Sequence, residues 1–407
     1  MAAAAKKKPA AKKAPAKKAA AKRPAAKKAA NKAAGSVPLR KALEDLGVAG
    51  ADYPPLVTRR VLLGPSGEPT EVHRAASDYF ASVNKEGVEF VSSGCALIDA
   101  VLGGGWALGR MANVVGDKSA GKTLLAIEAC ANFARQYPDG YIRYAETEAA
   151  FDVMYAEALG LPVDRVDFEA GDPEKGITTV EDFHEDVERV LDANPDRPIL
   201  YILDSFDALS DRAEAERSIT DNSFGASKAK KSGELFRRLT QRIESQRCLL
   251  MIVSQLRDKI GVTFGEKQTR SGGRALDFYA SQIVWLAEIG KIAVERGGVK
   301  RPIGVNVRMK CKKNKVGLPF RECEYPVIFG YGVDDLTAGV EWLIEVKRQE
   351  RLSDLGMSPA GYKVRIENLR NKGGAVMREA RATMDAIVRE EWQEIEKRFL
   401  PKSGKYP

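Results

Sequence analysis

The chain has 407 residues, of which 44% are hydrophobic, 65 are Lys or Arg and 56 are Asp or Glu, giving a formal net charge of +9. This length allows more than one domain and a large core. No apolar run approaches the roughly 20 residues that cross a bilayer, and the N-terminus lacks the apolar centre of a signal peptide. We therefore expect neither a membrane protein nor a secreted one.

The positive charge is concentrated at the N-terminus. Residues 1–34 contain twelve Lys or Arg and no acidic residue, and subtracting these twelve from +9 leaves −3 for the rest of the chain. The segment repeats Ala, Lys and Pro without aromatic residues, so we expect residues 1–35 to form a disordered basic tail. A block of positive charge on an otherwise acidic chain favours binding to nucleic-acid backbones; a solubilising or localising tail is the alternative.

The remaining chain divides into three predicted parts. Residues 36–85 read as a small N-terminal module that contacts other subunits, residues 86–331 as the core, and residues 332–407 as a small α-rich domain. In the core, largely apolar stretches at 110–115, 141–145, 198–203 and 248–253 are typical of strands buried on both faces. Helical patterns at 124–135, 180–192 and 233–245 separate them. The core is therefore predicted to be α/β with a mostly parallel sheet.

The second half of the chain changes character. Strands are expected at 282–287, 304–312 and 322–329 without full helical connections, which predicts an antiparallel extension of the sheet. Helices are expected at 340–347 and 375–399, with a turn or strand at 361–364 between them.

The cysteines and histidines do not indicate a metal site. The five cysteines are scattered without a CxxC pair, and Cys130 and Cys248 lie in apolar runs, so they are expected to be reduced core thiols. His184 lies in an acidic helical stretch and is predicted to be a solvated surface residue.

A phosphate-binding loop is the central feature of the sequence. Its eight residues fit the pattern G-x-x-x-x-G-K-[ST] between a predicted strand and a predicted helix. They are Gly116-Asp117-Lys118-Ser119-Ala120-Gly121-Lys122-Thr123. Amide hydrogens of such a loop converge on an anion; Lys122 is expected to reach the β- and γ-phosphates, and the Thr123 hydroxyl to bind Mg²⁺.

Three further polar residues follow predicted core strands. Asp204 ends an apolar run and is the second candidate for holding Mg²⁺. Glu146 and Glu148 both follow the 141–145 strand, and either could orient the water that attacks the γ-phosphate. Gln255 follows the 248–253 strand and could sense that phosphate through its amide.

The stretch 256–274 combines glycines, several cations and one aromatic residue, Phe264. Mobile backbone, positive charge and an aromatic side chain suit single-stranded nucleic acid, and a loop of this length is usually functional or disordered.

Several ordered motifs resemble those of RecA-type recombinases. They are residues 92–99 with Gly109-Arg110, the phosphate-binding loop, and residues 148–156, 259–265, 272–281, 313–315 and 319–320. The resemblance covers about residues 86–332. It implies a RecA-type P-loop NTPase core that uses ATP and Mg²⁺.

The resemblance assigns roles to individual residues. It matches Glu148 to the family's catalytic glutamate and Gln255 to the glutamine that links the γ-phosphate to the DNA-binding loop. It matches Asp152 and Tyr155 to residues that contact the adenine. It implies that Lys122, Lys313 and Lys315 take part in ATP hydrolysis. Lys313 and Lys315 would contact the ATP of a neighbouring subunit.

The resemblance also implies two DNA-binding loops. Residues 213–224 match the first approximately, and residues 256–270 match the second. The residues expected to bind DNA are Arg257, Lys259, Phe264, Lys267, Arg270, Gly272 and Gly273.

The chain departs from the family pattern in four places. Asp117-Lys118 replaces the usual Pro-Glu, and the region 212–231 is unusually basic. The family's N-terminal polymerisation helix is not recognisable in residues 36–85. The usual acidic C-terminal tail is absent, which predicts less restrained binding of duplex DNA.

The leading hypothesis is an ATP-dependent recombinase that forms a filament on single-stranded DNA and catalyses homologous pairing and strand exchange, with DNA-stimulated ATP hydrolysis. A ring helicase-like motor or regulator and a DNA-compacting structural protein are the alternatives. Expected partners are single- and double-stranded DNA, further copies of the chain, and single-strand-binding and mediator proteins, without a membrane. The expected location is the cytoplasm, at the nucleoid or in a host cell if the chain is viral.

Deleting residues 1–34 should weaken duplex DNA binding and make its logarithm less steeply dependent on the logarithm of salt concentration, because fewer counterions are released. Titrations of labelled duplex at several salt concentrations measure both quantities. An unchanged affinity and salt slope would contradict the role of the tail.

Overall fold

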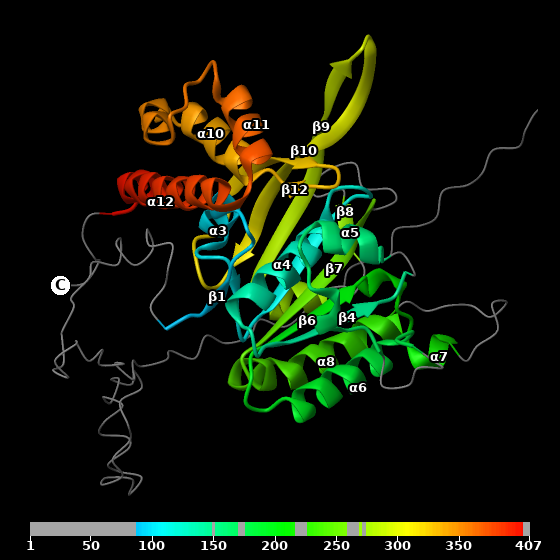
Figure 1. Ribbon diagram of the computed structural model, residues 1–407. Coiled ribbons are helices and arrows are strands. Elements are labelled where there is room, and N and C mark those ends of the chain that lie inside the picture. The colour runs from blue at the N-terminus through cyan, green and yellow to red at the C-terminus, as the bar shows by residue number, and fades with distance from the viewer. Residues whose placement is uncertain are drawn as a thin grey trace, which may run out of the picture. The chain divides into compact units, whose positions relative to one another are not determined.

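The computed structural model describes residues 87–148, 151–169, 176–215, 226–258, 268–270 and 274–401 (Figure 1). All of them belong to the second of the chain's two units, residues 73–407. The predictions for the tail (1–35) and the module (36–85) lie outside the described residues.

Among the described residues, ten strands form one sheet, in the order β12-β11-β10-β9-β3-β7-β6-β4-β5 with β8 paired to β7. The central strands β3, β7, β6 and β4 run parallel. Every residue of β3 and β6 is buried, as their apolar runs predict. The strands are β3 (Met111–Gly116), β4 (Tyr141–Glu146), β5 (Val166–Asp167), β6 (Ile199–Asp204), β7 (Cys248–Asp258), β8 (Gln268–Arg270), β9 (Gln282–Arg296), β10 (Val299–Asn314), β11 (Glu322–Ile328) and β12 (Gly332–Val333).

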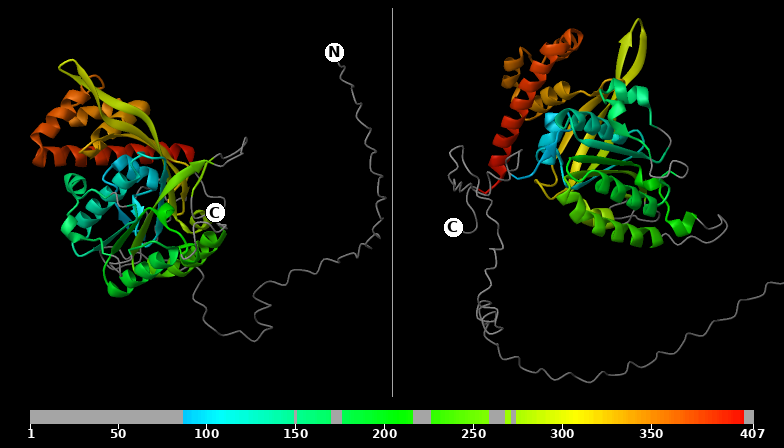
Figure 2. Two further views of the ribbon diagram at one scale, coloured as in Figure 1. Left: turned by 90° about the vertical axis from the view of Figure 1, so that its right-hand side faces the viewer. Right: turned by 60° about the horizontal axis from the view of Figure 1, so that its bottom comes forward.

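Helices cover both faces of this sheet (Figures 1 and 2). On one face, α3 (Ala96–Leu102) and α4 (Lys122–Gln136) share an apolar core with the C-terminal helices. On the other face, α6 (Val180–Ala193), α8 (Ala226–Ser245) and α9 (Arg274–Tyr279) enclose a second core. The α/β architecture predicted from the alternating pattern is confirmed.

Short elements complete the core. They are a two-stranded sheet of β1 (Phe90–Val91) and β2 (Trp106–Ala107), helices α5 (Val153–Ala158) and α7 (Arg212–Ala215), and 3-10 turns η1 (Val163–Arg165) and η2 (Phe206–Ala208). Among the described helices, none is both long and apolar enough to cross a bilayer.

The antiparallel extension is confirmed, but β9 and β10 are longer than the strands predicted at 282–287 and 304–312. β9 and β10 form a long hairpin that projects from the sheet (Figure 1). Side chains in the outer part of the hairpin are largely exposed, so hydrophobic residues need not alternate with polar ones there. The sequence therefore predicts only the buried half of each strand.

The C-terminal part is helical, with α10 (Asp335–Glu345), the 3-10 segment η3 (Gln349–Leu355), α11 (Tyr362–Lys372) and α12 (Gly374–Phe399). The predicted turn or strand at 361–364 is wrong, because α11 begins there. Tyr362, Ile366 and Leu369 are its buried residues, and their spacing of four and three is the helical period.

β7 also continues further than predicted. The sequence predicts that the strand ends at Gln255, but β7 extends to Asp258 and pairs antiparallel with β8, with Arg257 opposite Thr269. The start of the predicted long loop is therefore the stem of a hairpin.

All five cysteines are free and buried, as expected for reduced core thiols. Burial raises the pKa of each thiol, and that of Cys311 to about 12.

A buried ion pair that the sequence did not reveal joins β4 to α6. Arg143 and Asp186 have side chains only 1% and 3% exposed, with Nε 2.8 Å from Oδ2. Tyr201 and Arg189 also donate to this carboxylate. Burial alone would raise the pKa of Asp186, but Arg143 and these hydrogen bonds outweigh it and lower the pKa. The stabilisation is therefore present above the carboxyl group's unfolded pKa and is lost as the pH falls through the folded one.

Asp186→Ala should reduce the free energy of unfolding by about 3–5 kcal/mol, because Arg143 then stays buried without its carboxylate. Asp192→Ala on the same helix is the control: its pair with Arg242 is exposed, so the loss should stay below about 1 kcal/mol. Urea unfolding measures both free energies. Equal losses in the two variants would show that the buried pair stabilises the fold no more than the surface pair does.

Candidate functional site

The parallel register brings the candidate residues to one edge of the sheet. Gly116 at the end of β3 pairs with Gln255 of β7, and Glu146 at the end of β4 pairs with Asp204 of β6. Because the carboxyl ends of parallel strands meet at the same edge, four distant segments of chain converge there.

The phosphate-binding loop leaves β3 at this edge and leads into α4. Gly121 and Ser119 have φ of +83° and +62°, left-handed values that turn the loop before the helix begins at Lys122. At Gly116 a Cβ atom would lie 2.9 Å from the carbonyl oxygen of Leu286, so a side chain would not fit. The loop and the helix N-terminus form the cradle that an anion requires.

Lys122 lies over this loop, and its Nζ donates to the carbonyl oxygen of Asp117 at 2.7 Å. Burial lowers the pKa of Lys122, while the carboxylates of Asp204 and Glu148 oppose that shift. A cation that is partly desolvated beside backbone amides suits a phosphate. The residues present therefore fit ATP.

Thr123 and Asp204 form the candidate magnesium site. The Thr123 hydroxyl donates to Asp204 Oδ2 at 2.8 Å, and the Tyr144 hydroxyl donates to the same oxygen at 2.8 Å. Burial raises the pKa of Asp204, and the two hydrogen bonds work against that shift. Hydroxyl and carboxylate oxygens are ligands that Mg²⁺ accepts, so this pair fits the ion.

The two candidate glutamates have different hydrogen-bond partners. Glu148 Oε1 accepts hydrogen bonds from the Ser205 hydroxyl and, at 2.8 Å, from Gln255 Nε2. Glu146 instead accepts from the backbone N–H of Glu148 at 3.0 Å. Glu148 is thus the one in contact with Gln255, which favours it as the catalytic carboxylate.

The predicted adenine residues lie on the short helix α5. Asp152 caps the helix by accepting from the backbone N–H of Tyr155 at 3.0 Å. Tyr155 is half-buried against the core that contains α4, and this burial raises its pKa. The capping bond explains an aspartate at position 152 without a ligand, so adenine contact stays a prediction for both residues.

Lys313 and Lys315 lie beside the amino ends of the parallel strands, opposite the phosphate-binding loop. Their Nζ atoms donate to the carbonyl oxygen of Phe278 at 2.9 and 3.3 Å, at the end of α9. Asn314 and Ala112 both pair with Gln282, which places the lysines beside the start of β3. That point is about 13 Å along the strand from the phosphate-binding loop.

Most predicted DNA-binding residues cannot be placed. Lys259, Phe264, Lys267, Gly272 and Gly273 lie outside the described residues. Of the other two, Arg257 is in β7 and Arg270 is in β8, within the hairpin stem. Residues 213–215 of the first predicted DNA loop lie in α7, and residues 216–224 lie outside the described residues.

Sequence reasoning missed three residues of the site, namely Tyr144, Thr147 and Ser205. The Thr147 hydroxyl accepts from the Ser205 backbone N–H at 2.8 Å and so joins the ends of β4 and β6. Ser205 follows Asp204 directly, which was the available signal for it. Tyr144 lies inside an apolar run and gave no signal.

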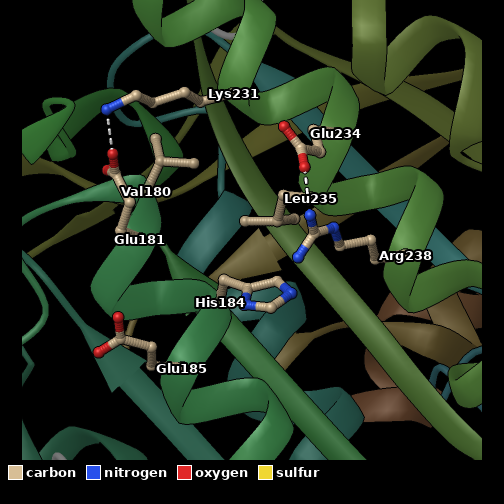
Figure 3. A pocket seen from close by; sticks show the side chains of 8 residues that line it. All are labelled: Val180, Glu181, His184, Glu185, Lys231, Glu234, Leu235 and Arg238. Atoms are coloured by element: carbon tan, nitrogen blue, oxygen red, sulfur yellow. Dashed lines mark hydrogen bonds and ion pairs between the residues drawn. The ribbon is translucent and has the colours of Figure 1, made fainter.

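A separate hollow lies between α6 and α8 (Figure 3). It has a volume of about 260 Å³, and Lys231–Glu181 and Arg238–Glu234 ion pairs line it. His184, predicted as a surface residue, faces it with its side chain 25% exposed. Lys231 and Arg238, the lysine and arginine that line the hollow, are each paired with a glutamate, so the hollow does not resemble an anion site.

Comparison with known proteins is consistent with this geometry. A sequence model of the RecA N-terminal domain matches residues 77–334. The chain is 32% identical to Protein RecA of Synechocystis sp. over 309 residues, which are 74% of this chain and 82% of that protein. It is 35% identical to Protein RecA of Nostoc punctiforme over 62% of this chain and 67% of that protein.

A third relative, Protein RecA of Prochlorococcus marinus, is 34% identical over 253 residues, 62% of this chain and 63% of that protein. The region that the family model matches, residues 77–334, contains the phosphate-binding loop, Glu148, Asp204 and Gln255. It covers more than half of the chain, and its described residues form the α/β core. The chain belongs to the RecA family.

Proposed function

We propose that the chain is an ATP-dependent DNA recombinase, which forms a filament on single-stranded DNA and catalyses homologous pairing and strand exchange. Members of its family are DNA-dependent ATPases, which supports DNA-stimulated hydrolysis here. The two alternatives are a ring-forming motor and a DNA-compacting protein. The first would explain the nucleotide site and the second the basic tail, but neither explains the position of Gln255 or of Lys313 and Lys315.

The observation that carries the proposal is the position of Gln255. Its amide touches Glu148 at the nucleotide site, and its strand continues through Asp258 toward the predicted DNA-binding residues. A change at the γ-phosphate that moves Glu148 would move this amide as well. One residue thus connects the hydrolytic site to the DNA loop.

The hydrolytic chemistry follows from the residues at the sheet edge. The loop amides and Lys122 bind the phosphates, and Glu148 orients and deprotonates the attacking water. Thr123 and Asp204 would hold Mg²⁺, which neutralises charge on the phosphates when bound. Release of Glu148 from Gln255 would free its oxygen for the water.

The lysines at the opposite end of the sheet support self-association. Within one chain, Lys313 and Lys315 bond to the end of α9 and lie away from the phosphate-binding loop. A neighbouring copy could present the same lysines to this loop, which would complete the site only in an assembly. Hydrolysis would then require the filament, a feature that suits a recombinase.

The proposed DNA contacts are the predicted residues of the second loop, namely Arg257 and Arg270 of the hairpin stem together with Lys259, Phe264, Lys267, Gly272 and Gly273. Single- and double-stranded DNA are the proposed substrates. Single-strand-binding and mediator proteins, and a place at the nucleoid, complete the proposal.

Strand exchange between homologous single-stranded and duplex DNA tests this function. The wild type with ATP should exchange strands, whereas Lys122→Ala should not, because it loses the cation at the phosphates. Agarose gels of the DNA products measure both. ATP hydrolysis stimulated by DNA without exchange would instead indicate a motor, and DNA binding independent of ATP would indicate a compacting protein.

Glu148→Gln should lower DNA-stimulated ATP turnover by about 100-fold or more, because the amide cannot accept the proton of water. ATP-dependent binding of single-stranded DNA should remain. Phosphate release and fluorescence anisotropy measure the two.

The matched control is Glu146→Gln, which makes the same chemical change two residues away and retains an oxygen for the Glu148 N–H. Its turnover should stay near that of the wild type. A larger loss in Glu146→Gln than in Glu148→Gln would exchange the roles of the two residues.

A further inference from the structure

The turn after β6 carries an acidic side chain that reaches the neighbouring strand. Asp207 lies in η2 (Phe206–Ala208), three residues beyond the magnesium candidate Asp204. Its Oδ2 accepts a hydrogen bond of 2.7 Å from the backbone N–H of Gln255. The predicted site did not include Asp207.

This hydrogen bond lies where the pairing of β7 with its neighbours β6 and β3 ends. The pairing of β6 with β7 ends at Leu203 and Ile252, and the pairing of β3 with β7 ends at Gly116 and Gln255. Beyond that point the described partner of β7 is β8 alone. The Asp207 carboxylate therefore continues the connection between the ends of β6 and β7 after the ladder between them has ended.

The turn that carries Asp207 is itself held in place. Lys228 of α8 donates to the carbonyl oxygens of Phe206, at 3.1 Å, and of Leu209. Its ammonium group also lies 4.9 Å from the centre of the Phe206 ring, and that ring is fully buried against Phe236. Asp207 thus acts from a fixed position.

Besides its pairing with Gly116 of β3, Gln255 is held by two side chains. Asp207 fixes its backbone N–H, and Glu148 accepts from its side-chain amide at 2.8 Å. The direction of a side chain depends on the orientation of its own backbone, so loss of the first contact would misdirect the second. The negative charge of Asp207 also acts on Lys122, where it favours the ammonium form.

We propose that Asp207 is the positioning residue that orients Gln255, and through it sets the strength with which DNA binding is coupled to ATP hydrolysis. This inference rests on the proposed function. It assigns to Asp207 no contact with ATP and no part in proton transfer. Without the hydrogen bond from Asp207 to Gln255, binding of DNA would no longer affect the position of Glu148.

Two kinds of substitution separate the hydrogen bond from the charge. Asp207→Ala and Asp207→Leu both remove the acceptor, and the leucine preserves most of the volume. Asp207→Asn removes the charge but keeps an oxygen that can accept from the Gln255 N–H. Asp196→Ala, at an exposed turn before the other end of β6, is the matched control for losing an aspartate.

The experiment measures ATP turnover by the full chain with and without single-stranded DNA, together with KM for ATP and the melting temperature. In Asp207→Ala and Asp207→Leu, the ratio of the two turnover rates should fall about tenfold, as expected for losing a hydrogen bond to a charged group. Turnover without DNA and KM should stay near the wild-type values. Asp207→Asn should restore most of the ratio.

A wild-type ratio retained in Asp207→Ala and Asp207→Leu would overturn the inference alone. So would a loss of the ratio in Asp207→Asn equal to that in Asp207→Ala, because the charge on Lys122 would then be responsible. A fall in turnover without DNA that matches the fall with DNA would reduce Asp207 to a structural role. Wild-type turnover that single-stranded DNA does not raise would overturn the proposed function itself, and the coupling with it.

Discussion

The constraint on which the site depends is the parallel register of β3, β7, β6 and β4. This register sets the phosphate-binding loop beside Gln255, and Asp204 beside Glu146. A shift of one residue in any of these strands would turn its buried side chains to the opposite face, so the two apolar cores hold the polar edge in place. The chemistry at the edge is therefore stabilised by residues that never touch a ligand.

Much of the fold could be predicted from the sequence, because the buried parallel strands correspond to short, largely apolar segments and α6 has an amphipathic helical pattern. The failures have physical causes. The outer parts of β9 and β10 contain no buried residue, so their sequences carry no clear core-facing pattern. α11 has only three buried residues among many charged ones, so its apolar stripe is too weak to predict a helix.

The candidate site was predicted as far as local motifs reach. Lys122, Thr123 and Asp204 belong to patterns contained in a few consecutive residues, and the last two meet in the structure at 2.8 Å. Tyr144 and Asp207 act instead on residues 60 and 48 positions away. Contacts of that kind depend on the register between strands, which no local pattern encodes. The choice between Glu146 and Glu148 rests on the family resemblance, with which the hydrogen bond between Glu148 and Gln255 is consistent.

The five buried thiols have a practical consequence for following the motions of this protein in solution. Thiol-reactive dyes attack the thiolate, and burial disfavours that form at every native cysteine. The folded chain therefore offers a nearly silent background for labelling. A cysteine introduced on the exposed outer part of the β9–β10 hairpin would carry a fluorophore selectively, without first replacing any natural residue of the core.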